Sequence, residues 1–316
     1  MILVFIEHND YQPKKSSLEA LNFAQTISSY NSGEVKAIYF GTQELTINLG
    51  VFGVKEVYQI TGAANCGSDQ ISNALSEAIV KLEPNYFLLS HSSMGKTVAG
   101  QIAVKSGRGL ISGAVGVIKE EKLLFKKTVF SGKAFAFYGF NQDGGIVTVV
   151  PNSISADPTT NEVSSTLPIN IILSESKITT VEKKLVKGKT PLTEAAIVVS
   201  AGRGMKDPSN WNMIEELADL LGATTACSRP VADVGWRPHH EHVGQTGIAI
   251  RPNVYIAIGI SGAIQHLAGV NNSRNIIVIN KDPEAPFFKA ADYGICGDLF
   301  EVVPKLNEAI RKAKTA

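Results

Sequence analysis

Short apolar runs alternate with longer segments of helical period along the first half of the chain. Apolar residues recur at helical spacing over residues 17–29 and 69–82, which predicts helices that bury one face. Strands joined by such helices predict right-handed crossovers and a mostly parallel sheet. The short, largely apolar runs predict buried strands at residues 2–6, 35–40, 86–90, 146–150 and 169–173.

Two later segments depart from this alternation. Residues 113–150 are richer in strand formers and contain Gly-Lys and Asp-Gly-Gly turns, so part of the sheet is expected to be antiparallel. Residues 181–191 are polar and basic and end in Pro, which predicts a solvated linker.

A second strand-and-helix series follows the predicted linker. It predicts strands at residues 196–200, 254–260, 275–279 and around Tyr293, with helices at 209–221 and 299–313. The chain is therefore expected to be an α/β protein of two domains, each with a mostly parallel sheet flanked by helices. The boundaries place an N-terminal α/β domain at 1–189 and a doubly wound C-terminal domain at 190–316.

The amino-acid composition excludes several classes of protein. Lys+Arg 30 against Asp+Glu 29 leaves a net charge of +1, and aromatic residues make up 7% of the 316 residues. The chain therefore lacks the net positive charge that favours nucleic-acid binding, and it has too few aromatic residues to stack the bases of single-stranded nucleic acid. Three widely spaced cysteines exclude a disulfide scaffold and a Cys-rich metal site.

From its apolar runs we expect the chain to have neither a membrane span nor an export signal. The apolar run at 1–6 stops at Glu7 and lacks a basic flank, and no run of about 18 apolar residues occurs. The expected compartment is the cytoplasm, or the mitochondrial matrix if the source is eukaryotic, although no transit peptide is seen.

Two glycine-containing motifs fail on spacing. Gly95-Lys96-Thr97 resembles the end of a phosphate loop, but Ser90 stands where its first glycine belongs, so the start of a helix is the better interpretation. Gly202-Arg203-Gly204 follows a strand, but Asp207 stands where the third glycine of a dinucleotide fingerprint belongs.

A histidine-rich segment offers no recognised metal motif. His239–His242 lacks the zincin spacing because Gly244 stands where the second histidine belongs, and we expect a solvated loop and no functional metal. No nucleophile motif, Cys/His pairing or carboxylate dyad stands out.

Three strand-end loops rich in glycine, hydroxyl and basic residues remain: 200–204, 228–247 and 259–266. In a parallel sheet such loops share the edge at which ligands bind. In the third, a strand leads into Ser261-Gly262 and then a helix, so backbone N–H groups and the helix dipole face the crevice, and Ser261 is expected to cap the helix. Spacing alone favours a phosphate-containing ligand, with Arg203 or Arg229 as its charge partner.

The amino-acid sequence of these loops identifies a protein family more specifically than the spacing of their glycines does. It runs through residues 243–247, 255–269, 279–286, 291–294 and 297–304. Together these segments closely resemble the alpha subunit of electron transfer flavoproteins. The resemblance is strong over about residues 196–310 and extends loosely to 4–8 and 95–99.

The resemblance implies one FAD, held chiefly by the C-terminal domain. Residues that match the family motif and would line this FAD are Arg203, Ser228, Arg229, Val243, Gly244, Gln245, Thr246, Ser261, Gly262, Ala263, Ile264, Gln265, His266, Asn280, Asp298 and Leu299. The stretch 236–242, where the family varies, leaves the partner-facing edge undefined.

Roles follow from the chemistry of a one-electron carrier, which must stabilise a flavin radical with charge at N1 and O2. Arg229 and His266 are the side chains expected near that charge, and Thr246 is expected to donate its hydroxyl near N5. Gln245 would bond to the flavin or its ribityl chain. Residues 261–264 would hold the pyrophosphate.

Other roles have simpler alternatives. Asn280 and Asp298 would fix the adenosine end, although Asp298 is also a plausible cap for the helix from Leu299. His266 has the alternative of a buried histidine bonded to a carbonyl, and Arg229 that of a surface pair with Asp233.

The family further implies a heterodimer. A beta subunit, which usually adds AMP, would dock on the N-terminal domain; flavin dehydrogenases of the acyl-CoA type would supply electrons and a membrane quinone oxidoreductase would accept them. The protein would be a carrier and not an enzyme. Open alternatives are an electron-bifurcating relative with a second FAD in the beta subunit, a flavin- or NAD-dependent dehydrogenase, and a nucleotide-binding regulatory protein.

Overall fold

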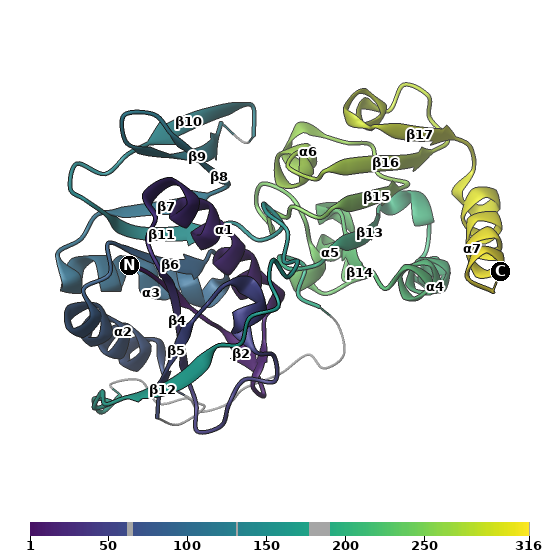
Figure 1. Cartoon of the computed structure of the whole chain (residues 1–316). Helices are drawn as coiled ribbons and strands as arrows, with labels where there is room; N and C mark the ends of the chain where they lie inside the picture. The colour runs from purple at the N-terminus through teal and green to yellow at the C-terminus, as the bar shows by residue number, and fades with distance from the viewer. Residues whose placement is uncertain (62–65, 131, 177–189, 316) are drawn as a thin grey trace. The chain divides into compact units, whose positions relative to one another are not determined.

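The computed structural model describes residues 1–61, 66–130, 132–176 and 190–315 (Figure 1). It divides into two compact units, one made of Met1–Val129 and Lys133–Leu185, the other of Phe130–Gly132 and Val186–Ala316. Almost all of the predicted linker at 181–191 lies outside the described residues. No helix among the described residues is long and apolar enough to cross a membrane.

The N-terminal unit is built on a seven-stranded sheet in which every neighbouring pair is parallel, in the order β12-β5-β4-β1-β6-β11-β7. Its strands are β1 Ile2–Phe5, β4 Val35–Phe40, β5 Glu56–Ile60, β6 Tyr86–Ser90, β7 Leu110–Ala114, β11 Gly145–Val149 and β12 Ser165–Ile169. Its helices are α1 Lys15–Asn31, α2 Ser68–Leu82 and α3 Ser93–Ser106. The expected α/β fold with mostly parallel sheets is confirmed.

Each face of this sheet carries its own hydrophobic cluster. On one face α1 contributes Leu21 and Phe23, which pack with Phe125 and the sheet. On the other face α2 and α3 contribute Leu75 and Ile102. The central strands are buried on both sides, which is why they read as continuous apolar runs.

The antiparallel strands form a sheet of their own, which corrects the expectation that they belong to the main sheet. β8 Gly116–Lys119, β9 Leu123–Val129 and β10 Ala134–Tyr138 pair in the order β10-β9-β8. A further two-stranded ribbon joins β2 His8–Asn9 to β3 Gln12–Pro13.

The strand predicted at 169–173 is misplaced. The strand is β12, Ser165–Ile169, which pairs with β5 from Ser165 opposite Glu56. Ile171 is buried, but it lies in a coil segment. β12 lies at the edge of the sheet and is largely exposed, so its apolar pattern is weak.

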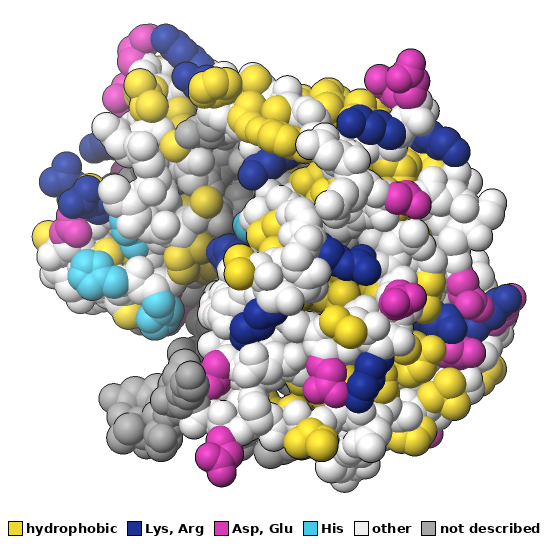
Figure 2. Space-filling model, turned by 90° about the vertical axis from the view of Figure 1, so that its left-hand side faces the viewer, with side chains coloured by type: hydrophobic (Ala, Val, Ile, Leu, Met, Phe, Trp, Pro, Cys, Tyr) yellow, Lys and Arg dark blue, Asp and Glu magenta, His cyan; other side chains and the backbone are white. Residues whose placement is uncertain are grey.

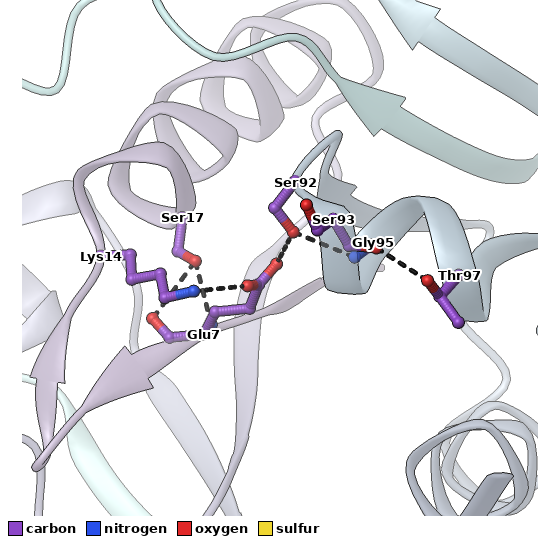
Figure 3. Close-up of polar contacts among 7 residues, drawn as sticks. All are labelled: Glu7, Lys14, Ser17, Ser92, Ser93, Gly95 and Thr97. Atoms are coloured by element: carbon purple, nitrogen blue, oxygen red, sulfur yellow. Dashed lines mark hydrogen bonds and ion pairs between the residues drawn. The ribbon is translucent and has the colours of Figure 1, made fainter. Parts of the chain in front are cut away.

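The order of the strands reverses beside β1, because the chain continues from β1 to β4 on one side and later returns with β6 on the other. Glu7 follows β1 at this point and is only 7% exposed. Its carboxylate accepts a hydrogen bond from the Ser92 hydroxyl and lies 3.1 Å from the Lys14 ammonium (Figure 3). The side chains of this unit therefore satisfy the buried charge.

Gly95 belongs to the first turn of α3, which confirms the interpretation of Gly95-Lys96-Thr97 as a helix start. Ser92 caps the helix by accepting from the Gly95 N–H at 3.0 Å, and the Thr97 hydroxyl donates to the Ser93 carbonyl at 2.9 Å (Figure 3). A β-carbon at Gly95 would lie 1.8 Å from the Ser90 carbonyl oxygen. The glycine is thus needed for close packing of helix on strand.

The C-terminal unit is built on a five-stranded sheet, again parallel throughout, in the order β14-β13-β15-β16-β17. Its strands are β13 Ile197–Ala201, β14 Thr224–Cys227, β15 Val254–Ile258, β16 Asn275–Asn280 and β17 Tyr293–Cys296. Its helices are α4 Asn212–Leu221, α5 Arg229–Asp233, α6 Ile264–Val270 and α7 Leu299–Thr315. Two further core clusters cover its two faces, one with α4 and α7 and one with Tyr255 and Phe287.

Candidate functional site

The strand order of the C-terminal unit reverses at β13, whose successor β14 lies on one side and β15 on the other. The loops that leave β13 and β15 touch through their backbones here. A β-carbon on Gly202 would lie 2.4 Å from the Gly259 carbonyl oxygen, and one on Gly204 would lie 2.7 Å from the Gly259 Cα. The glycines of the Gly202-Arg203-Gly204 segment are therefore explained by backbone packing at the switch point, where ligands bind in sheets of this type.

A cavity of about 420 Å³ opens at this edge of the sheet. Its walls come from the loops after β13, β14 and β15 and from the segment between α5 and β15. It is lined by Arg203, Ser228, Arg229, Pro230, His242, Val243, Gly244, Gln245, Thr246, Gly259, Ile260, Ser261, Ala263, Gln265 and His266. Most of the residues expected from the sequence thus meet around one cavity.

The inner wall of the cavity contains a buried imidazole. His266 is 7% exposed, and its Nε2 lies 2.7 Å from the Tyr255 hydroxyl. Burial, with a smaller contribution from His242, lowers the pKa of His266 to about 4, despite a hydrogen bond to the Val243 backbone. His266 is therefore neutral at neutral pH in this structure.

Positive charge at the cavity comes from two exposed arginines, Arg203 and Arg229. The Arg229 Nε lies 3.3 Å from an oxygen of Asp233, and both side chains are more than half exposed, at 61% and 52%. This is the surface pair that the sequence allowed, and a pair so exposed contributes little to stability. The Arg229 guanidinium is therefore available to an anionic ligand.

Other predicted residues lie outside the cavity wall and act on the backbone around it. Asn280 donates from its amide to the Ile260 carbonyl at 3.0 Å. Asp298 accepts from the Phe300 N–H at 2.9 Å, which fits the cap expected for α7. Ser261 does not cap α6, because the residue before the helix is Ala263.

Two of the remaining three predicted residues, Gly262 and Leu299, pack closely against their neighbours, and the third, Ile264, is exposed. Gly262 has φ +84°, and a β-carbon there would lie 2.6 Å from the backbone nitrogen of Phe287. The side chain of Leu299 packs onto Gly259, whose β-carbon position lies 2.9 Å from the Leu299 Cδ2. The Ile264 side chain is 78% exposed.

The sequence analysis missed four lining residues, Pro230, His242, Gly259 and Ile260. The histidine-rich segment is solvated only in part: His239 and His240 are exposed as expected, but the two residues after them are buried. Glu241 is 8% exposed and pairs with Arg237 at 2.7 Å, and His242 is 8% exposed.

The donors at this cavity suit a phosphate-containing cofactor. Within the described residues, the backbone N–H groups of Ser261, Gly262 and Ala263 donate to no protein acceptor. Free N–H groups in a strand-to-helix loop, with arginines nearby, are the donor set that a pyrophosphate requires. The fold and the cavity therefore define a nucleotide-binding α/β protein.

Comparison with known proteins specifies the class. Residues 2–171 match the electron transfer flavoprotein domain, and residues 191–271 match the electron transfer flavoprotein FAD-binding domain. The chain is 36% identical to the electron transfer flavoprotein subunit alpha of Bacillus subtilis (strain 168), over 98% of this chain and 97% of that protein. It is 35% identical to the subunit alpha of Mycobacterium leprae (strain TN), over 99% and 98%. It is 33% identical to the mitochondrial subunit alpha of Dictyostelium discoideum, over 99% and 92%.

The chain therefore belongs to the electron transfer flavoprotein alpha-subunit family. Its cofactor is FAD, and its role is in electron transfer. Membership in this family also implies a beta subunit as its partner.

Proposed function

We propose that this chain is the FAD-carrying subunit of a heterodimer that moves single electrons from flavin dehydrogenases of the acyl-CoA type to a membrane quinone oxidoreductase. The observation that carries the proposal is the cavity at the switch point of the C-terminal sheet, lined by the motif residues of the family. The domain boundary proposed near residue 190 leaves this cavity wholly in the C-terminal domain.

Each wall of the cavity has a proposed part in holding FAD, which supplies the one-electron chemistry when bound. The free N–H groups of residues 261–264 bind the pyrophosphate, with Arg203 as a charge partner. Thr246 and Gln245 donate to the flavin ring and its ribityl chain. Arg229 lies toward the N1 and O2 side of the ring.

Further proposed contacts complete the set. Ser228, Val243, Gly244, Gln265 and His266 line the flavin end of the cavity. Asn280, Asp298 and Leu299 lie outside the cavity and are proposed to serve the adenosine end. A cavity of about 420 Å³ is too small to hold the whole FAD molecule, so part of FAD must lie beyond it.

The side chains around the cavity suit a carrier better than an enzyme. His266 is buried, neutral and bonded to Tyr255, so it orients the ring and accepts no substrate proton. Among the described lining residues no carboxylate is present. A dehydrogenase that uses a carboxylate base beside the flavin ring would find none among these lining residues.

The distribution of charged side chains on the surface does not favour binding of a polyanion such as a nucleic acid. On the face of the molecule in Figure 2, Lys and Arg side chains are interspersed with Asp and Glu. This agrees with the net charge of +1. The proposed partners are proteins, and the proposed compartment is the bacterial cytoplasm, or the mitochondrial matrix in a eukaryote.

The proposed docking surface for the beta subunit is β10 of the N-terminal unit. β10 is an edge strand, and its large aromatic side chains Phe135 and Phe137 are 52% and 49% exposed at alternate positions that share one face. Tyr138 adjoins them at 45% exposed. Aromatic residues of this kind are typical anchors of protein interfaces. The beta subunit itself is proposed to hold AMP, or a second FAD if the complex bifurcates electrons.

Phe137→Glu is expected to weaken the heterodimer at least tenfold, because it places a charge in an apolar contact. The affinity is measured by titrating the beta subunit against each variant. Val104→Glu, at an 83% exposed position on α3, is the matched control and is expected to bind like the parent protein. Equal affinity for Phe137→Glu would exclude β10 from the interface.

A stepwise dithionite titration of the heterodimer tests the proposed function. We expect one flavin per heterodimer, bound to this chain. We also expect the absorbance spectrum to show a one-electron-reduced flavin that accumulates before full bleaching. Direct two-electron bleaching, or reduction of the flavin by NADH alone, would refute the carrier function and favour a dehydrogenase. Two flavins per heterodimer would indicate the bifurcating alternative.

A further inference from the structure

His242 is a buried imidazole in the cavity wall for which the proposed function gives no role. The residue is 8% exposed, and its side chain lines the cavity. Within the described part of the chain, neither of its ring nitrogens has a hydrogen-bond partner. Buried polar groups are nearly always hydrogen-bonded, so an imidazole of this kind at a ligand cavity indicates a contact with what the cavity holds.

The ring of His242 is held against the segment that the family motif assigns to the flavin. A β-carbon on Gly247 would lie 2.8 Å from the His242 Nδ1, and one on Gly244 would lie 3.5 Å from its Nε2. These two glycines flank Gln245 and Thr246. The imidazole is therefore fixed next to the residues proposed to contact the flavin ring.

Ionisable groups face His242 from several elements. Burial lowers the pKa of His242, Asp233 opposes this, and Arg229 and His239 lower it further. Arg229 and Asp233 belong to α5, and His239 belongs to the short 3-10 helix His239–Glu241. His242 is therefore neutral at neutral pH, but a new negative charge in the cavity would favour its protonation.

Two other titratable groups near His242 do not compete for that proton. Burial raises the pKa of the Cys227 thiol, on the neighbouring β14, to about 12, so the thiol stays neutral. His266, on α6, has a pKa lowered to about 4 and is bonded to Tyr255. Of the two cavity imidazoles, His242 is the one with ring nitrogens free to take a proton.

We propose that His242 is the proton-binding residue of the FAD site: it takes up one proton from solvent when the flavin gains one electron. The inference rests on the proposed function, because it requires FAD in this cavity. The step is balanced, since one electron enters the flavin, one proton adds to a ring nitrogen of His242, and no bond of the protein breaks.

The direction of the pH dependence follows from this linkage. Reduction places negative charge beside His242 and raises its pKa, so proton uptake occurs between its pKa in the oxidised and in the reduced protein. Over that interval the potential of the first electron rises as the pH falls. One proton per electron corresponds to a slope of about 59 mV per pH unit.

The test compares His242→Gln with the parent heterodimer by redox titration from pH 5.5 to 8.5. Gln keeps a polar side chain that takes up no proton, so we expect the pH slope of the first-electron potential to be reduced. His240→Gln, the same substitution at an exposed position two residues away, is the matched control and is expected to keep the parent slope. In the parent protein, NMR of labelled histidine is expected to show a pKa of His242 at least one unit higher after reduction.

Each result decides the inference. Equal slopes for His242→Gln and the parent would overturn it, and so would a His242 pKa that does not change on reduction. The NMR measurement uses the parent protein, so it decides even if the variant folds poorly. Failure of the proposed function is distinct, because the parent and His240→Gln would then also lack a one-electron step.

Discussion

Gly262→Val is expected to lose most of its FAD, with retention weakened by more than tenfold. Gly262 has φ +84°, a conformation that costs a residue with a side chain about 1–2 kcal/mol. Its β-carbon would also lie 2.6 Å from the backbone nitrogen and the Cβ of Phe287, which is fully buried. The loop must therefore move, and its free N–H groups move with it.

Flavin retention is measured as the ratio of bound FAD to protein after gel filtration of the heterodimer. Gly222→Val is the matched control, since Gly222 has φ +62° but a β-carbon there meets nothing within 4 Å. The control carries the conformational strain without the contact and lies at the end of α4. Full FAD occupancy in Gly262→Val would exclude this loop from the pyrophosphate site.

Arg229→Ala is expected to lower the potential of the first electron by about 80 mV. A charge about 4 Å from the flavin at a partly exposed site contributes about 2 kcal/mol, between the values for water and for a protein surface. At about 1.4 kcal/mol per 59 mV for one electron, this gives the expected shift. The potential of the second electron is expected to change less, so the gap between the two couples narrows.

Redox titration with absorbance detection measures this change. Arg229→Lys keeps the charge and is the matched control, expected to retain at least half of the effect. Asp233→Asn removes the acidic partner that lies 3.3 Å from Arg229 and is expected to shift the potential upward. An unchanged potential in Arg229→Ala would remove Arg229 from the flavin environment.

The sequence predicted the parallel sheets because strands buried on both faces read as apolar runs. β1, β4 and β6 were predicted within a residue of their bounds. β12 was not, because an edge strand that is largely exposed has no such run. The antiparallel region 113–150 was recognised by its turns, but turn residues do not tell which sheet a hairpin joins.

The cavity was predicted mainly from the amino-acid sequence of three loops, but the buried position of His242 in its wall was missed. His242 belongs to a polar segment, and polarity alone predicted exposure. In the structure His242 is 8% exposed, and its neighbour Glu241 accepts from Arg237 at 2.7 and 2.8 Å. The periodicity of hydrophobic residues in a sequence does not predict an ion pair of this kind.

The protonation state of His266 could not be read from the sequence either. Its motif indicated a position beside the flavin, but the pKa of an imidazole depends on how deeply it is buried and on its partners. Tyr255 lies eleven residues away on β15 and meets His266 only because β15 and α6 pack together.

The separate core clusters on the two faces of each sheet have a thermodynamic consequence. Each unit encloses its own hydrophobic interior, so each can in principle unfold by itself. Free energy gained from FAD binding stabilises only the unit that holds the ligand, by an amount that grows with the logarithm of free FAD concentration. When flavin is scarce, this stabilisation is lost, so we expect proteolysis of the C-terminal half to become faster and the abundance of the protein to follow the supply of its cofactor.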